Sequence, residues 1–420
     1  MPSPPPPPAD PKPHERFALP RPLPEFTLPP EGVPPAVEAR YFAPERWDAE
    51  VANRGPDDDR DPVEHGLGKQ ESEAAAVLFV SDFHMADGSA GGDDFLDSHL
   101  HRDEDLGLMT GFFPPGGSRA GLFASVVTFA LERVARRAAG RPRLDVVLHG
   151  DVVNFLELKG RGGTFVSRKH LPFYHTLDAL RGRGTVYWLR GNHDYVVPEG
   201  PWRRGEFYAN PALQVLAEHG DVFDQENWPP GPNNKGSRLA IEAGSPFEVH
   251  AGVDEHGTVK YLMSGIDNLR PWDDDAIEAF LDRRARHSDV ALIAAALARL
   301  DYLGAADDSA AYQGALKRRQ RQEYRDWLMV QGHTHVPAFA AGVYYNTGTW
   351  IATLVAPGGE EKHVEAFPFL LVYRDADGRR VEEYYTADQP TADDAPTAVL
   401  HTKESVNELR REYGYGELDD

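Results

Sequence analysis

The stretch Val77-Leu78-Phe79-Val80-Ser81-Asp82-Phe83-His84 combines a predicted strand with two side chains that can bind a metal ion. Its four consecutive apolar residues, bounded by polar positions, are typical of a buried strand in a mostly parallel sheet. Asp82 and His84 lie two positions apart, and in extended backbone such positions point to the same side. The carboxylate and the imidazole can therefore converge, which gives half of a site for a divalent metal ion.

Further apolar runs along the chain also end in polar residues. Strands are predicted at 144–149, 185–189 and 327–331, and amphipathic helices at 121–138 and 170–180. The alternation of strands and helices predicts an α/β fold, with a layered sheet flanked by helices. Because α/β sheets place their sites at the carboxyl ends of strands, we expect the polar residues that follow these strands to form one site.

The residues at these strand ends are of the types that bind divalent cations. The chain contains no cysteine, so a metal ion must be held by His, Asp, Asn or Glu. Each short motif alone has a structural explanation; Gly-Asp after a strand, for example, commonly forms a turn. Their order along the chain, with helical segments between them, favours a metal site. The candidates are Asp82, His84, Asp151, Asn192, His193, Asp194, His333 and His335, together with His219, which follows a further strand predicted at 211–218.

The composition is that of a globular protein. The chain has 420 residues, enough for one large α/β domain with insertions or for two domains, and 41% of them are hydrophobic. No apolar run approaches the roughly 20 residues of a membrane span, and no secretory signal is visible. A formal net charge of −23 argues against a broad contact with nucleic acid or with an anionic membrane. We expect an acidic, soluble, cytoplasmic protein.

Three regions are predicted from the distribution of residue types. Residues 1–70 are rich in proline, which favours an irregular or disordered segment, or a docking peptide for a partner. Residues 74–386 carry the strand and helix patterns, with a helical insertion or cap at about 254–328. We expect this cap to line the mouth of the site and to influence the choice of substrate. The acidic residues 387–420 are expected to form a peripheral tail.

The order of the motifs resembles that of a known family. Asp-x-His, Gly-Asp, Gly-Asn-His-Asp, a further His and Gly-His-x-His, spread over about residues 77–350, are similar to the signature of calcineurin-like metallophosphoesterases. The resemblance implies a β-sandwich flanked by helices and two divalent metal ions that share one carboxylate. It implies that the first ion is bound by Asp82, His84, Asp151 and His335, and the second by Asp151, Asn192, His219 and His333. Such mixed nitrogen and oxygen ligands suit Mn²⁺, Fe or Zn²⁺.

The resemblance also implies a reaction. A hydroxide that bridges the two metal ions would attack the phosphorus of a phosphomonoester, a phosphodiester or a pyrophosphate in line. His193 is then the candidate general acid or transition-state donor for the leaving oxygen. Asp194 can orient the ring of His193 and raise its pKa, or it can cap the following helix. His250 competes with His219 for the fourth motif, and the segment His219-Gly220-Asp221, which resembles bacterial members, favours His219.

The sequence indicates the substrate less specifically than it indicates the reaction. The motifs around Asp82 and His219 are similar to those of UDP-2,3-diacylglucosamine diphosphatases, whereas the charge and the Pro-rich segment favour a soluble phosphorylated substrate. A nuclease of the same superfamily is an alternative, although the acidic balance disfavours nucleic acid. Its phosphate contacts would be Arg161, Arg168, Lys169 and Arg190. A non-catalytic scaffold that binds partners through the Pro-rich segment is a further alternative. Many relatives have an acidic residue where this chain has Asn154. The difference would affect the fine tuning of the metal site and not its existence, because this position would support the ligands.

Overall fold

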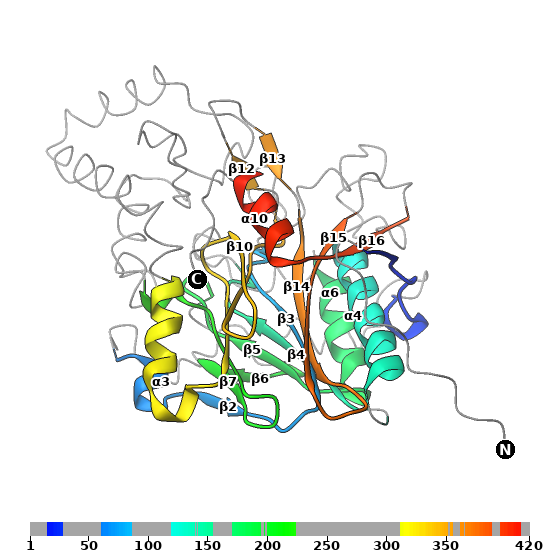
Figure 1. Cartoon of the computed structure of the whole chain (residues 1–420). Helices are drawn as coiled ribbons and strands as arrows, with labels where there is room; N and C mark the ends of the chain where they lie inside the picture. Colours follow the sequence, from blue (N-terminus) through cyan, green and yellow to red (C-terminus); the bar gives the residue numbers. More distant parts are fainter. Residues whose placement is uncertain are drawn as a thin grey trace, which may run out of the picture.

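The computed structural model describes residues 15–27, 60–85, 119–138, 140, 142–153, 170–194, 197, 200–223, 311–351, 353–355, 362–364, 366–388 and 395–412. Within these residues, two large mixed β-sheets pack face to face and helices cover their outer faces (Figure 1). This arrangement confirms the α/β sandwich expected from the sequence. The predicted insertion at about 254–328 lies outside the described residues as far as residue 310.

The larger sheet contains eight strands. In spatial order they are β1 (Arg16–Ala18), β16 (Thr397–Leu400), β15 (Arg380–Asp388), β14 (Pro368–Arg374), β3 (Ala76–Val80), β4 (Leu144–His149), β5 (Val186–Leu189) and β6 (Arg203–Gly205). The strands β3, β4, β5 and β6 run parallel, and β14 runs antiparallel to β3. The first three strands predicted from the sequence therefore lie next to one another at the centre of this sheet.

The second sheet contains six strands. In spatial order they are β10 (Pro337–Ala340), β11 (Tyr344–Thr347), β9 (Leu328–Gln331), β8 (Val215–Glu218), β7 (Phe207–Asn210) and β2 (Lys69–Glu71). β8, β9 and β11 run parallel, so β8 and β9 end at the same edge. A separate antiparallel pair is formed by β12 (Thr353–Val355) and β13 (Lys362–Val364).

Helices connect the parallel strands of the larger sheet. The helix α4 (Arg119–Arg137) precedes β4, and α6 (Leu171–Ala179) precedes β5, which is the predicted alternation. Every residue of α4 from Leu122 to Ala130 is buried, so the middle of this helix is covered on all sides. The other helical elements are α3 (Pro62–His65), α10 (Lys403–Glu412), a helix over residues 311–320 and the 3₁₀ turns η1 (Pro24–Phe26), η4 (Leu180–Gly182), η5 (Asp221–Phe223) and η6 (Gln322–Tyr324).

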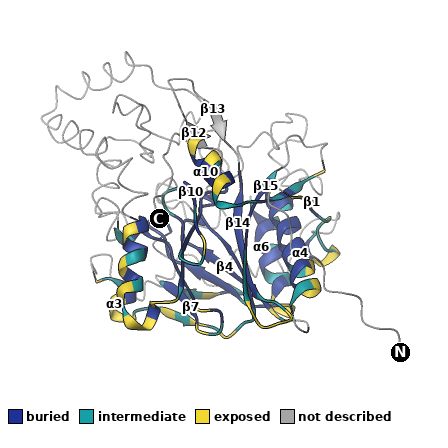
Figure 2. Cartoon of the chain, viewed as in Figure 1, coloured by how far each residue is buried: buried dark blue, intermediate teal, exposed yellow. Residues whose placement is uncertain are grey.

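Alternate residues of the central strands face different cores. In β3, Leu78 and Val80 pack in the core that includes α4 and α6, whereas Val77 and Phe79 pack between the two sheets. A third core lies on the outer face of the second sheet, where helix 311–320 contributes Ala315. The central strands are therefore buried on both faces, as their dark colour in Figure 2 shows. Strands held in this way are rigid supports for side chains at their ends.

Two segments differ from their predicted roles. The sequence predicts an irregular segment at 1–70, but β1 pairs with β16 and β2 pairs with β7. It predicts a peripheral tail at 387–420, but β16 pairs with β15, and α10 lies over β10 in Figure 1. Arg410 of α10 donates a hydrogen bond to the carbonyl oxygen of Pro337 (3.2 Å). β1 and β2 have three residues each, too few positions to show a period, so the sequence pattern misses them.

Candidate metal centre

The predicted ligands follow the strands β3, β4, β5, β8 and β9, and they meet at one end of the sandwich. Backbone hydrogen bonds join the loops that carry them. Asp82 N–H donates to the carbonyl oxygen of Gly150 (3.1 Å) in the larger sheet, and Gly332 N–H donates to that of His219 (3.0 Å) in the second sheet. The two sheets thus present their carboxyl ends to a common place, as expected for α/β sheets.

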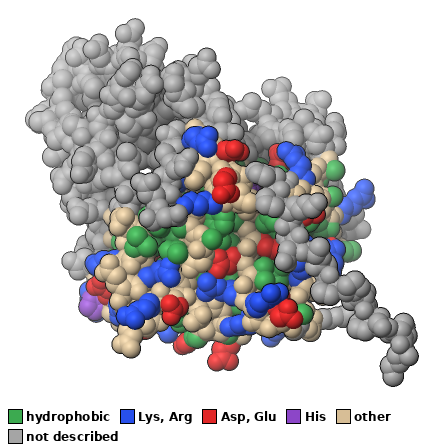
Figure 3. Space-filling view, in the orientation of Figure 1, with side chains coloured by type: hydrophobic (Ala, Val, Ile, Leu, Met, Phe, Trp, Pro, Cys, Tyr) green, Lys and Arg blue, Asp and Glu red, His purple; other side chains and the backbone are tan. Residues whose placement is uncertain are grey.

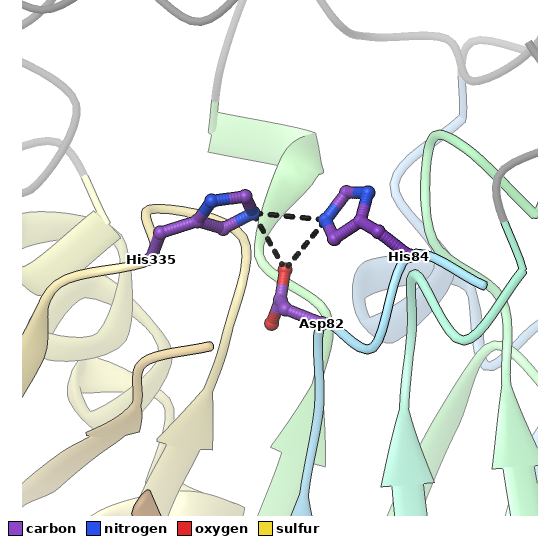
Figure 4. Close-up of side chains that lie close together, drawn as sticks. All are labelled: Asp82, His84 and His335. Atoms are coloured by element: carbon purple, nitrogen blue, oxygen red, sulfur yellow. Dashed lines mark hydrogen bonds and ion pairs between the residues drawn. The ribbon is translucent and has the colours of Figure 1, made fainter. Parts of the chain in front are cut away.

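Asp82, His84 and His335 form the first group of donor atoms (Figure 4). The Nε2 atoms of His84 and His335 lie 2.9 Å apart. Asp82 Oδ1 lies 3.3 Å from His335 Nε2 and 3.8 Å from His84 Nε2. In Figure 4 the two imidazoles approach from opposite sides, with the carboxylate below them. Two ring nitrogens and one carboxylate oxygen therefore point to the same place.

Asp151, His219 and His333 form the second group. His219 Nε2 lies 3.1 Å from Asp151 Oδ2 and 3.0 Å from Asn192 Oδ1. The other ring nitrogen of His219, Nδ1, lies 3.0 Å from the carbonyl oxygen of His149. When Nδ1–H donates to this carbonyl group, the lone pair of Nε2 is available to a cation. The structure thus brings His219 together with Asp151 and Asn192, as the sequence predicts.

Asp151 lies between the two groups. Its Oδ2 atom is 3.8 Å from His84 Nε2 and 3.1 Å from His219 Nε2. His193 Nε2 is 4.0 Å from the same oxygen, and the ring centroids of His193 and His84 are 4.8 Å apart. The side chain of His193 is 10% exposed, whereas that of His84 is 1% exposed. Asp151 can therefore be shared by two cations, and His193 lies beside them nearer to solvent.

Five candidate ligands have a left-handed backbone. The angle φ is 56° at Asp82, 46° at His84, 52° at Asp151, 66° at His333 and 58° at His335. The sequence argument that Asp82 and His84 converge through extended backbone is therefore wrong, because both residues lie in a turn after β3. Non-glycine residues seldom adopt positive φ, and each such residue costs about 1–3 kcal/mol. Asp82 and His84 therefore converge from left-handed backbone, which carries this cost at both positions.

Two glycines of the predicted motifs allow the ligand loops to approach one another. A Cβ atom at Gly191 would lie 2.1 Å from Asp151 Oδ1, and a Cβ atom at Gly332 would lie 2.3 Å from Asp82 Oδ2. Both distances are far below van der Waals contact, so a larger residue at either position would displace a candidate ligand. The glycines that precede Asn192 and His333 are therefore required by close packing.

The carboxylate of Asp194 supports the loop of Asp151. Its Oδ1 accepts hydrogen bonds from the backbone amides of Asp151 (3.1 Å) and Gly191 (2.6 Å). Its Oδ2 accepts hydrogen bonds from the next amide along the chain (2.9 Å) and from the indole N–H of Trp188 (2.8 Å). These contacts hold the carboxylate against the loop of Asp151, and the role of Asp194 toward the ring of His193 stays a prediction. Trp188 was not predicted, because an aromatic residue in a strand is typical of a core.

The buried carboxylates of the site require nearby positive charge. Asp82 and Asp151 are at most 1% exposed. Burial alone would raise the pKa of both groups, but hydrogen bonds and charges from the surrounding histidines hold both pKa values below the ordinary range. Burial opposes the protonation of His219, yet the charge of Asp151 outweighs it and raises the pKa of His219 to about 10. Without a bound cation, a proton on His219 therefore balances part of the negative charge of the carboxylates.

The donor atoms fit divalent cations. They are imidazole nitrogens, carboxylate oxygens and the amide oxygen of Asn192, a mixture that suits Mn²⁺, Fe or Zn²⁺ better than Ca²⁺ or Mg²⁺. The Nε2 atoms of His84 and His335 share a hydrogen bond at 2.9 Å, and a cation that replaced its proton would use the lone pairs of both atoms. The chemistry of both groups is therefore that of a site for divalent metal ions.

Asn346, at the end of the buried strand β11, supports the last of the ligand turns. The side chain is fully buried, and Nδ2 donates to the carbonyl oxygen of Gly332 (2.8 Å) and to Thr334 Oγ1 (3.0 Å). Its Oδ1 accepts a hydrogen bond from Gly348 N–H (2.8 Å). The amide therefore holds the turn that carries two candidate histidines. In the sequence, Asn-Thr-Gly after a strand is typical of any turn, so this contact gives no specific signal.

The remaining residues predicted to contribute to the site either have another partner or lie outside the described residues. Arg190 lies close to the site, but its guanidinium forms an ion pair with Glu206 (2.6 Å). The predicted residues that lie outside the described part of the chain are Asn154, Arg161, Arg168, Lys169 and His250. Among the described helices, none is both long and apolar enough to cross a membrane.

Comparison with known families identifies the matching region. The profile of the calcineurin-like phosphoesterase family matches residues 75–346, which is more than half of the chain. All nine candidate site residues, from Asp82 to His335, lie inside this region. No curated protein matches the chain significantly.

Proposed function

Because the chain belongs to the calcineurin-like phosphoesterase family, we propose that it hydrolyses phosphate ester or pyrophosphate bonds with the help of two divalent cations. The observation that carries this proposal is the position of Asp151, whose Oδ2 lies within 3.8 Å of His84 Nε2 and 3.1 Å of His219 Nε2. One carboxylate oxygen between two groups of donors supports a pair of cations with a common ligand.

Each cation has its own group of ligands in this proposal. The first would be held by Asp82, His84, Asp151 and His335. The second would be held by Asp151, Asn192, His219 and His333. Mn²⁺, Fe and Zn²⁺ are the candidate ions, because they accept this mixture of nitrogen and oxygen ligands.

The proton chemistry is assigned to His193. When bound, the cations would polarise the phosphoryl group and lower the pKa of a water molecule. His193 Nε2 lies 4.0 Å from Asp151 Oδ2, which places the imidazole beside the shared carboxylate. From there the ring can donate a proton to the leaving oxygen. The backbone N–H of His193 donates to Asp151 Oδ1 (2.9 Å), which fixes the proton donor relative to the shared carboxylate.

The charge distribution bears on the class of substrate. The chain has a formal net charge of −23, and acidic and basic side chains are interspersed on the described part of the face shown in Figure 3. Arg190, the described member of the predicted basic cluster, is engaged by Glu206. These features favour a small soluble phosphomonoester, phosphodiester or pyrophosphate over a nucleic acid.

Metal analysis and turnover test the proposal together. Mass spectrometry of the purified protein should find about two transition-metal ions per chain. After addition of Mn²⁺, the protein should hydrolyse bis-p-nitrophenyl phosphate or p-nitrophenyl phosphate; preference for the diester indicates a phosphodiesterase, and preference for the monoester indicates a phosphatase. Protein that remains metal-free and inactive in the presence of Mn²⁺ would contradict the proposal and favour a non-catalytic scaffold.

A further inference from the structure

A buried arginine, Arg318, pairs with the residue that directly precedes the candidate ligand His219. Arg318 belongs to helix 311–320 and is 2% exposed. Its Nε and Nη2 groups donate to the two carboxylate oxygens of Glu218, at 3.1 and 2.9 Å. Its Nη1 group donates to Asp61 Oδ2 at 2.6 Å. Such a two-pronged pairing between guanidinium and carboxylate fixes orientation as well as distance.

Glu218 joins the ends of two strands. It is the last residue of β8 and directly precedes His219. Its Oε1 also accepts a hydrogen bond from the side chain of Gln331 (3.2 Å), which is the last residue of β9 and lies two positions before His333. Gly332 N–H donates to the carbonyl oxygen of His219 at 3.0 Å. The backbone segments that carry His219 and His333 are therefore tied together beside the Arg318–Glu218 pair.

The helix of Arg318 also packs against the turn η5 that follows His219. Gly314 and Arg318 are four residues apart, so they lie on the same face of the helix. A Cβ atom at Gly314 would lie 2.5 Å from the ring of Phe223, and the guanidinium of Arg318 lies 4.9 Å from the centroid of that ring. The segment from Glu218 to Phe223 is thus enclosed between this helix and β9.

Asp61 connects the same arginine to the N-terminal part of the chain. Its Oδ1 caps α3 by accepting hydrogen bonds from the amides of Val63 (3.0 Å) and Glu64 (3.1 Å), while its Oδ2 pairs with Arg318. Asp61 lies outside the residues that match the family profile. Arg318 therefore links a segment outside the matched region with the strand that carries His219.

We infer that Arg318 is a positioning residue for the cation site that contains His219 and His333, an inference that rests on the proposed function. It acts through Glu218 and touches neither histidine in the contacts described above. Without the guanidinium, Glu218 would be a buried carboxylate that lacks its cation, which disfavours the present arrangement of the two strand ends. His219 Nε2 would then lose its position relative to Asp151 and Asn192.

The effect should be selective for one of the two sites. The group of Asp82, His84 and His335 receives two of its members from the turn after β3, which lies in the other sheet. None of the hydrogen bonds of Arg318 described above reaches that turn. Loss of the arginine should therefore weaken the binding of the second cation while the first is retained.

Titration of the full-length protein with Mn²⁺, followed by electron paramagnetic resonance, tests this inference. The wild type should bind two ions and develop the spectrum of a coupled pair. Arg318→Lys keeps the charge but lacks the planar fork. It should bind the second ion about 10- to 100-fold more weakly than the wild type and the first ion as tightly. His219→Ala, which removes a candidate ligand of the second ion, should show the same selective loss. Arg321→Ala, which removes a pair with Glu323 (3.0 Å) outside this network, is the matched control and should behave like the wild type.

The outcomes separate this inference from the proposed function. Wild-type protein that binds no Mn²⁺ would overturn both. If Arg318→Lys binds both ions like the wild type, or loses both equally together with a fall in melting temperature, only the inference is overturned. If that variant does not fold, the triple variant Asp61→Asn/Glu218→Gln/Arg318→Met removes the guanidinium together with the charges of both carboxylates to which it donates. It should show the same selective weakening, and tight binding of both ions would overturn the inference.

Discussion

Asn346→Leu should weaken both the fold and the binding of metal ions, because one buried amide holds the turn of His333 and His335. Leucine has a similar shape but no polar group. The change leaves Gly348 N–H without the acceptor that it has at 2.8 Å, at a cost of about 1–3 kcal/mol for a buried donor. It also removes the hydrogen bonds to Gly332 and Thr334, worth about 1 kcal/mol each. The free energy of unfolding should fall by about 3–5 kcal/mol.

The same substitution should reduce the affinity for Mn²⁺. The backbone of His333 (φ 66°) and His335 (φ 58°) is strained, and each such residue costs about 1–3 kcal/mol. When the amide no longer holds the turn, relaxation of this strain moves the two imidazoles away from the other donors. Changes in groups that support ligands commonly weaken metal binding by about 10- to 100-fold, and we expect a loss in this range.

Urea unfolding of the metal-free protein and calorimetric titration with Mn²⁺ measure the two effects. Asn210→Leu is the matched control, because Asn210 is also fully buried, donates to Ala74 (2.9 Å) and accepts from Leu213 (2.9 Å). It pairs with the first residue of β8, at the opposite end of that strand from His219. The free energy of unfolding of this control should fall by a similar amount, and its affinity for Mn²⁺ should not change. Unchanged affinity in Asn346→Leu, or equal loss of affinity in both variants, would refute the reasoning.

Three further predictions concern the site itself. Asp151→Asn should lose the bound ions and all turnover while its circular dichroism stays native, since the shared carboxylate is gone; retained turnover would exclude the assignment of two cations. His193→Ala should keep both ions by mass spectrometry and lower kcat by about 10²- to 10⁴-fold, the usual contribution of a general acid; an unchanged kcat would remove His193 from the reaction. Because the pKa of His219 is raised to about 10 without metal, a cation must displace a proton at neutral pH. The affinity for Mn²⁺ should therefore rise about tenfold per pH unit between about pH 6 and 8, with proton release seen by calorimetry in two buffers; affinity independent of pH would contradict this.

The sequence predicts well where the candidate ligands lie, because their position depends on strong and local signals. The apolar runs before Asp82, Asp151 and His333 are all buried strands. Those before Asp82 and Asp151 are parallel neighbours in one sheet, so they end at a common edge, whereas the run before His333 lies in the other sheet. When residues that bind metal ions follow several such strands, their side chains can be expected to meet, even though the backbone angles at these residues are unknown. This part of the site follows from the strand pattern and from the chemistry of its side chains.

The supports of the site could not be predicted in the same way, because they depend on contacts between distant segments. Arg318 occurs in a charged helical stretch and would be expected on the surface, yet it is buried by Glu218 and Asp61, which are 100 and 257 residues away in the sequence. Asp194 has a histidine as its neighbour in the chain, but its carboxylate faces backbone amides. Local spacing does not determine which of several polar partners a buried side chain meets.

The backbone of the ligands helps to distinguish an enzyme from a scaffold that has kept only the fold. Among the residues that the structure describes, seven that are not glycine have positive φ, and five of these are candidate ligands. Local preferences oppose each of them, so together they cost several kcal/mol, on the order of 5–15. A fold under selection for stability alone has no reason to concentrate this strain at the residues able to bind cations, whereas functional sites commonly retain it. The left-handed turns at Asp82, His84, Asp151, His333 and His335 therefore favour a working metal centre.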